Sequence, residues 1–205
     1  MQKKGQQGFT LIEMAIVLVI IGLILGMVFK GRELIASAKV KSANAAYNKV
    51  VAGTNIYLDR YGVYPGDGCG AADTTPQACL GKGVGAYDGI VSDANEIAAF
   101  FTLLKNSGIL TTADTKSALG DEWRVGGNSN ATWVYVEAAD LRLVCDLDRV
   151  ADDGNPNTGI IRAGEDSPED TFNGAAQSED NDGYKAGADC WSKEGTASVL
   201  LKVLP

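Results

Sequence analysis

One carboxylate stands alone in the apolar N-terminal run of this sequence. Glu13 is the single charged residue in the 21 residues from Phe9 to Phe29. An acid at the centre of a bilayer costs about 2.5 to 3.5 kcal/mol on insertion scales, and an unpaired buried one costs more. The stretch Thr10-Leu11-Ile12-Glu13 also fits a capping box, which closes the first turn of a helix. Glu13 is therefore either a helix cap or one half of an ion pair with a cation from outside its own segment.

Acidic side chains gather in the last third of the chain. Between Asp146 and Glu194 there are 13 acids and four bases. Two groups have a spacing that suits a hard cation such as calcium: Asp146, Asp148, Asp152 and Asp153 around one turn, and the run Asp180-Asn181-Asp182-Gly183. No Glu follows at the twelfth position, so the run is not an EF-hand, and a solvated acidic face is the alternative. We expect no cofactor, with calcium at Asp180 and Asp182 as a hypothesis.

Four cysteines offer thiol chemistry: Cys69, Cys79, Cys145 and Cys190. Their spacing does not fit a CxxC metal site. An even number in a chain that enters an oxidising compartment predicts two disulfides, with three possible pairings, and four buried thiols are the alternative. A Cys69–Cys79 bond would close a short loop and contribute about 3 kcal/mol. A Cys145–Cys190 bond would fix the acidic loops to the core.

The groups that most enzymes use are missing. The sequence has no His, which removes the commonest general base and transition-metal ligand. It also has no GxSxG, no P-loop and no dinucleotide-binding glycine motif. Residues 1–64 carry a net charge of +5 and residues 65–205 one of -13, so the C-terminal part repels phosphate backbones. We therefore expect neither an enzyme nor a nucleic-acid-binding protein.

The segment Phe9–Phe29 is long enough to cross a bilayer. At about 1.5 Å per residue it covers the roughly 30 Å hydrocarbon core. It is longer than the apolar region of a secretory signal, and no small-x-small cleavage site follows it. Basic residues flank both ends, so they do not fix the orientation. The disulfides, if they form, place the C-terminal domain on the oxidising side and the N-terminus in the cytoplasm.

The stretch KKGQQG followed by FTLIEM resembles the leader and first mature residues of type IV pilins and type II secretion pseudopilins. The resemblance implies that a prepilin peptidase cuts between Gly8 and Phe9 and that Phe9 is N-methylated. It further implies that Glu13, the fifth mature residue, pairs with the N-terminus of a neighbouring subunit. Many pilins have a Pro near the end of the membrane segment, whereas the first Pro here is Pro65.

The same resemblance implies a structural subunit of a type IV pilus-like filament, or alternatively a pseudopilin that drives protein export. The implied partners are prepilin peptidase, other pilin or pseudopilin subunits and the inner-membrane assembly machinery. The protein would be single-pass in the inner membrane with a periplasmic C-terminal domain, and would then enter a filament in the periplasm or at the cell surface. An uncleaved, membrane-anchored periplasmic binding domain is the alternative from another class.

A long helix must carry the N-terminal residues. Apolar side chains repeat at spacings of three and four between Tyr47 and Tyr61, Gly62 suits a left-handed C-terminal position, and Pro65 prevents continuation. The pattern predicts a helix from Phe9 to Tyr61 whose second half packs on the following domain. The expected boundaries are a leader at 1–8, a membrane helix at 9–29, an amphipathic continuation at 30–62 and a globular domain at 63–205.

The globular domain begins with an irregular loop, residues 61–83, that is rich in Gly, Pro and Asp. A capping box at Asp93 predicts a helix that ends by Gly108. WRVGG and ATWVYVEA predict a hairpin with the turn Gly-Gly-Asn-Ser-Asn.

ADLRLVCDLDRVADDG fits both a strand and a helix. A helix is favoured because the following DDGNPNTGIIRA resembles pseudopilin-like proteins that have a short helix there. Residues 160–163 and 198–204 are expected strands. The predicted fold is α+β and pilin-like: a long N-terminal helix, membrane-spanning in its first half, on a small antiparallel sheet with irregular disulfide-closed loops.

Overall fold

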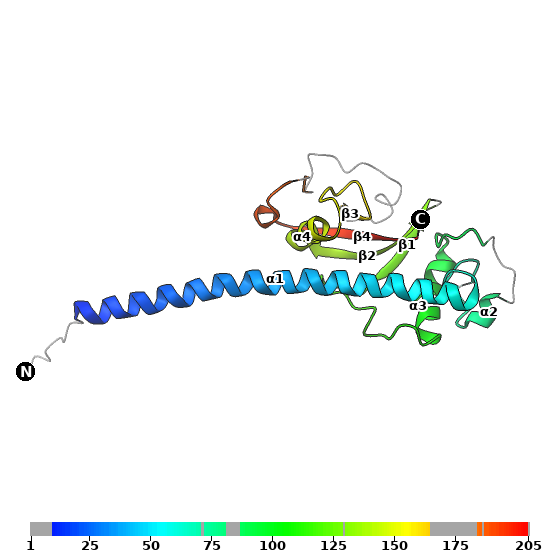
Figure 1. Cartoon of the computed structure of the whole chain (residues 1–205), viewed down its shortest axis with the longest axis horizontal. Coiled ribbons are helices and arrows are strands. Elements are labelled where there is room, and N and C mark those ends of the chain that lie inside the picture. The colour runs from blue at the N-terminus through cyan, green and yellow to red at the C-terminus, as the bar shows by residue number, and fades with distance from the viewer. Residues whose placement is uncertain are drawn as a thin grey trace, which may run out of the picture. The chain divides into compact units, whose positions relative to one another are not determined.

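The computed structural model describes residues 10–70, 72–80, 87–128, 130–164, 184–185 and 187–204. Their elements, in chain order, are α1 (Leu11–Tyr61), α2 (Pro76–Leu80), α3 (Ala94–Asn106), β1 (Arg124–Asn128), β2 (Ala131–Asp140), α4 (Leu141–Ala151), β3 (Ile161–Gly164), the 3-10 helix η1 (Cys190–Ser192) and β4 (Thr196–Leu204) (Figure 1). The chain divides into two compact units, Met1–Ala38 and Lys39–Pro205. The fold is α+β and pilin-like, as the sequence predicts.

Helix α1 has 51 residues and ends where the sequence predicts. Gly62 follows it with a positive φ of 77° and donates its N–H to the carbonyl of Leu58, because glycine accepts the left-handed conformation without strain. Within the second unit, the helix buries the predicted stripe of residues: Val40, Ala43, Tyr47, Val50, Gly53, Thr54 and Tyr57. The hydroxyl of Tyr47 donates to the carbonyl of Lys202 at 2.5 Å, which joins this stripe to β4.

The sheet has four strands in the order β1-β2-β4-β3, and all neighbours are antiparallel. The C-terminal strand β4 is therefore central. Residues Val134, Val199 and Leu201 are 0% exposed. On the other face, Trp133 and Leu200 are also buried, and the guanidinium of Arg162 lies 4.9 Å from the Trp133 ring centroid, a cation–π contact. Both faces of β2 and β4 are therefore covered.

The predicted hairpin is present, but its turn is shorter than predicted. Gly126, Gly127 and Asn128 belong to β1 instead of the turn. A Cβ at Gly127 would lie 2.6 Å from the carbonyl oxygens of both Ala131 and Val91, so close backbone packing requires a glycine inside this strand. The two glycines mark a close approach of neighbouring backbone, which the sequence pattern does not distinguish from a turn.

Helix α3 begins with the predicted capping box. The Asp93 side chain accepts from the N–H of Asn95, and the Glu96 side chain accepts from the N–H of Asp93. The expected loop over residues 61–83 was wrong in one respect, because it contains the short helix α2. Cys79 lies in α2 and bonds to Cys69, so the disulfide fixes this helix against the preceding turn.

Helix α4 confirms the favoured reading of the ambiguous segment. Asp140 caps it by accepting the N–H of Arg142. An irregularity between Val136 and Ala139 precedes the cap, and Ala138 there has a positive φ of 50°. The expected strands near residues 160 and 200 are β3 and β4.

Candidate functional site

The first turn of α1 holds the carboxylate that the sequence singles out. Oxygen Oε2 of Glu13 accepts from the backbone N–H of Thr10 at 2.8 Å and from its hydroxyl at 2.7 Å. The N–H of Glu13 in turn donates to the Thr10 hydroxyl oxygen at 3.3 Å. This is the reciprocal capping box that was one of the two explanations for Glu13. The cleavage residues Gly8 and Phe9 lie outside the described residues, so cleavage and methylation stay predictions.

After this cap, α1 presents apolar side chains on every side. All residues from Leu11 to Lys30 are exposed in the isolated chain. In the described part of the chain, α1 is the one helix that is long and apolar enough to cross a membrane. A helix that is apolar all round is stable in a bilayer or among other helices, and not in water. The segment therefore fits a single-pass membrane anchor.

Two disulfides close the loops of the second unit. They join Cys69 to Cys79 and Cys145 to Cys190, the two pairings that the sequence analysis put forward. The second bond ties the middle of α4 to η1. This disulfide lies close to the end of α4. Arg149, one helical turn after Cys145 and next to Asp148 in the sequence, has a guanidinium nitrogen 3.8 Å from the Cys190 sulfur.

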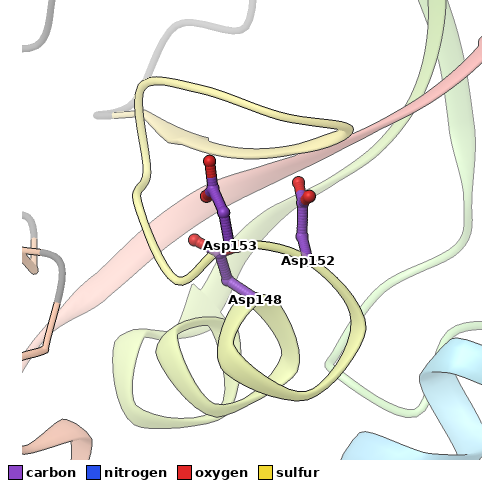
Figure 2. A group of neighbouring side chains, drawn as sticks. All are labelled: Asp148, Asp152 and Asp153. Atoms are coloured by element: carbon purple, nitrogen blue, oxygen red, sulfur yellow. The ribbon is translucent and has the colours of Figure 1, made fainter.

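Three acids meet at the end of α4. Ligand oxygens of Asp148, Asp152 and Asp153 all lie within 4.8 Å of one another. Figure 2 shows Asp152 and Asp153 rising from the end of the helix toward the loop that leads to β3. Asp146, the fourth acid of the predicted cluster, is not part of this group. We refer to residues 145–161, Tyr184 and Cys190 as the late corner.

Each of these carboxylates accepts hydrogen bonds that fold the turn. Asp148 accepts from the Tyr184 hydroxyl at 2.6 Å and from the N–H of Gly154 at 3.1 Å. Asp152 accepts from the N–H groups of Ile160 and Ile161. Asp153 accepts from the N–H of Asn155 and the hydroxyl of Thr158. A cation at the turn would share lone pairs that already have donors, so the cluster is explained by its own hydrogen bonds.

Burial sets the proton affinity of Asp148. The residue is 0% exposed, and burial together with the charges of Asp152 and Asp153 raises its pKa to about 6, although the Tyr184 and Gly154 donors act in the opposite direction. Burial also raises the pKa of Tyr184, and its bond to Asp148 adds to that effect. At the exposed end of the cluster, the Thr158 and Asn155 donors lower the pKa of Asp153.

The other predicted calcium residues, Asp180 and Asp182, lie outside the described residues. Calcium at these residues therefore stays a hypothesis.

Sequence reasoning missed two buried groups. Tyr184 is 2% exposed and bonds to a residue 36 positions earlier. Asp67, in the loop after α1, is also 2% exposed. No local residue spacing predicts the burial of either side chain. The one available signal for Asp67 is its place between two glycines, which allow tight backbone packing around a short polar side chain.

Comparison with known proteins agrees with the N-terminal geometry. The model of the prokaryotic N-terminal methylation motif matches residues 3–29. A search among curated proteins gave no match to the chain. The matched stretch contains Gly8, Phe9, Glu13 and the apolar part of α1, and it is the prepilin-type signal of type IV pilins and pseudopilins. The chain therefore combines a prepilin-type N-terminal signal with a pilin-like fold. Processing by prepilin peptidase and assembly with other pilin subunits follow from that signal.

Proposed function

We propose that this chain is a structural subunit of a type IV pilus-like filament, cut by prepilin peptidase between Gly8 and Phe9, methylated on Phe9 and assembled through α1. The observation that carries the proposal is the methylation motif, which coincides with the apolar, fully exposed part of that helix. No described side chain of the chain covers this surface, so other helices or lipid must do so. The role is mechanical and not catalytic.

Glu13 has a task in assembly that its cap allows. In the single chain, both hydrogen bonds to its carboxylate come from neutral donors on Thr10. A charge in an apolar helix bundle needs a cation, and cleavage would create a free amine at Phe9 of each subunit. Pairing between Glu13 and the amine of a neighbour would neutralise both charges and align the two helices along the filament.

The proposed orientation follows from the two disulfides, which form in oxidising compartments. The second unit would be periplasmic and the N-terminus cytoplasmic, with the subunit held in the inner membrane until the assembly machinery extracts it. A pseudopilin of a type II secretion system uses the same signal, and we keep it as the second candidate because the methylation motif supports both equally.

Mass spectrometry of the chain from its native host tests the processing step. We expect an N-terminal Phe9 carrying one added methyl group. Gly8→Val should leave the precursor uncut because the larger side chain crowds the scissile bond. An intact Met1 terminus on the wild-type protein would instead support the anchored binding domain and remove the pilin proposal.

Two substitutions separate capping from charge pairing at Glu13. Glu13→Gln keeps an oxygen that can accept from Thr10 but has no charge, whereas Glu13→Val has neither. Both variants should insert into membranes at least as well as wild type, because each substitution removes the charged group from the membrane-spanning segment. Both should also be excluded from filaments when wild-type subunits compete. If Glu13→Gln enters filaments as well as wild type, Glu13 acts only as a cap.

A further inference from the structure

Asp67 lies buried where the chain leaves α1. Residues 62–70 and 87–96, which we call the early corner, fold together around it. The N–H of Gly68 donates to Oε1 of Glu96 at 2.9 Å. Gly66 has a φ of 95°, and a Cβ there would lie 2.6 Å from the Glu96 carbonyl oxygen. The loop thus packs directly on the first turn of α3, and the Asp67 side chain, 2% exposed, has little access to water.

Within the described part of the chain, only one oxygen of this carboxyl group has a partner. Oδ2 accepts from the N–H of Gly89 at 3.1 Å. Oδ1 is buried, and no group among the described residues bonds to it. Asp148, another buried acid of the unit, has a donor on each oxygen. An ionised Asp67 would therefore hold half of its charge against an unsatisfied position, which is unfavourable in a protein interior.

The charged groups around Asp67 have the wrong sign for an ionised carboxylate. Glu96 faces it from α3 and Asp88 from the loop before that helix, and among the described residues no Lys or Arg acts on it. Burial is the main influence, these two charges add to it, and the N–H groups of Gly89 and Asp88 oppose it. The resulting pKa of Asp67 is raised to about 6.

We propose that Asp67 is a pH-responsive group that controls the packing of the early corner: the neutral acid keeps the loop closed on α3, and ionisation opens the loop to water. A group whose folded pKa lies above its unfolded value binds its proton more tightly in the folded state. The stability that Asp67 contributes is thus full below about pH 4 and is lost as the pH rises from there through about 6. The subunit would carry a looser early corner at pH 7.5 than at pH 5.

Carbon-13 NMR of the side-chain carboxyl groups tests the proton itself. The sample is the full chain in detergent micelles with both disulfides intact, and the Asp67→Asn variant assigns the signal. We expect a titration midpoint near the raised pKa of about 6. A midpoint at or below about 4, the ordinary value, would overturn the proposal. This measurement needs only the wild-type fold and one assignment, so a poorly folded variant can be replaced by Asp67→Glu.

Hydrogen exchange followed by mass spectrometry tests the opening. After correction for the intrinsic pH dependence of exchange, peptides covering residues 62–70 and 87–92 should lose about tenfold protection between pH 5 and pH 7.5. Asp67→Asn should keep its protection at both pH values, because a neutral amide imitates the protonated acid. Asp88→Asn, the matched control, leaves Asp67 ionisable, so protection should still fall between pH 5 and pH 7.5. The fall should be slightly smaller than in wild type, because the charge of Asp88 is one of the influences that raise the pKa of Asp67.

Two results would contradict the proposal in this experiment. One is an identical pH dependence in wild type and Asp67→Asn. The other is protection at pH 7.5 that appears with calcium and disappears with chelator, because the carboxylate would then be held by a cation in place of a proton.

Discussion

The globular unit has two corners that share a plan, a buried aspartate beside a disulfide, and they lie at opposite ends of that unit (Figure 1). Burial raises the pKa of Asp67 and of Asp148 to about 6 in both. The corners differ in hydrogen-bond partners: among the residues that the structure describes, donors reach both oxygens of Asp148 but only one oxygen of Asp67. Burial therefore determines the direction of the pKa shift, while the number of hydrogen-bond donors determines whether the carboxylate holds the surrounding loop in place.

The largest expected difference between the corners is how much each disulfide contributes to the free energy of unfolding. The Cys145–Cys190 bond spans 45 residues and the Cys69–Cys79 bond spans 10. On the chain-entropy model, removing the longer bond costs about 4 kcal/mol and removing the shorter about 3 kcal/mol. Paired Cys→Ser variants, unfolded in urea and followed by tryptophan fluorescence, would measure both. Equal losses would mean that local contacts, and not loop length, determine the effect.

Removing the buried aspartate should also cost more stability in the late corner than in the early corner. Asp148→Ala removes the partners of a buried hydroxyl and a buried N–H, and should cost about 3 kcal/mol at pH 7. Asp67→Ala removes an acceptor from backbone N–H groups alone and also removes the repulsion from Glu96 and Asp88, so a loss of about 1 kcal/mol or less is expected. Urea unfolding of the two variants in parallel gives the comparison. A larger loss for Asp67→Ala would reverse the roles that we assign to the corners.

Elements that are marked by local signals could be predicted from the sequence better than contacts between residues far apart in the chain. The end of α1 at Gly62, the capping box of α3 and the strands follow from spacing and from residues with special backbone preferences, which are local signals. The Tyr184–Asp148 bond joins residues 36 apart, and the Gly127 contact with Val91 joins different elements. Such contacts depend on the tertiary fold, and neither periodicity nor caps encode them. At the candidate site, the role of Glu13 as a cap could be predicted, but its proposed partner belongs to another subunit.

Calcium should act on the late corner alone. The hypothesis places the ion between Asp180, Asp182 and the other acids of the C-terminal third, where it would reduce their mutual repulsion. At a hundredfold excess over its dissociation constant, calcium would add about 2.7 kcal/mol and raise the melting midpoint by several degrees. Thermal unfolding of the full chain in micelles, with calcium and with chelator, measures this. The double variant Asp180→Ala with Asp182→Ala should abolish the shift, and the control Asp88→Ala should not. If calcium does not change the wild-type midpoint, the acids form only a solvated acidic face.

Tyr184→Phe sharpens the comparison through its pH dependence. The phenol donates to the ionised Asp148, so its loss raises the pKa of that acid further and penalises the charged form. The cost should be about 1 to 2 kcal/mol at pH 8 and smaller at pH 5, where Asp148 is neutral in both proteins. Urea midpoints at the two pH values provide the measurement. A pH-independent cost would indicate that only packing was lost.

The smallest expected effect concerns backbone conformation at the entrance to each corner. The early corner has glycine at its positive-φ positions, including Gly62 with φ 77°, whereas Ala138, two residues before the cap of α4, has φ 50°. A left-handed conformation costs a non-glycine residue about 1 kcal/mol. Replacing that residue by glycine removes this strain, but part of the gain in stability is offset because glycine makes the unfolded chain more flexible. Ala138→Gly should thus raise the unfolding free energy by about 0.5 kcal/mol. The matched Gly62→Ala, which meets no atom within 4 Å, should lower it by about 1 kcal/mol through strain alone. Urea unfolding resolves a difference of this size between the pair, and a loss of stability in Ala138→Gly would show that its methyl group makes a contact worth more than the strain.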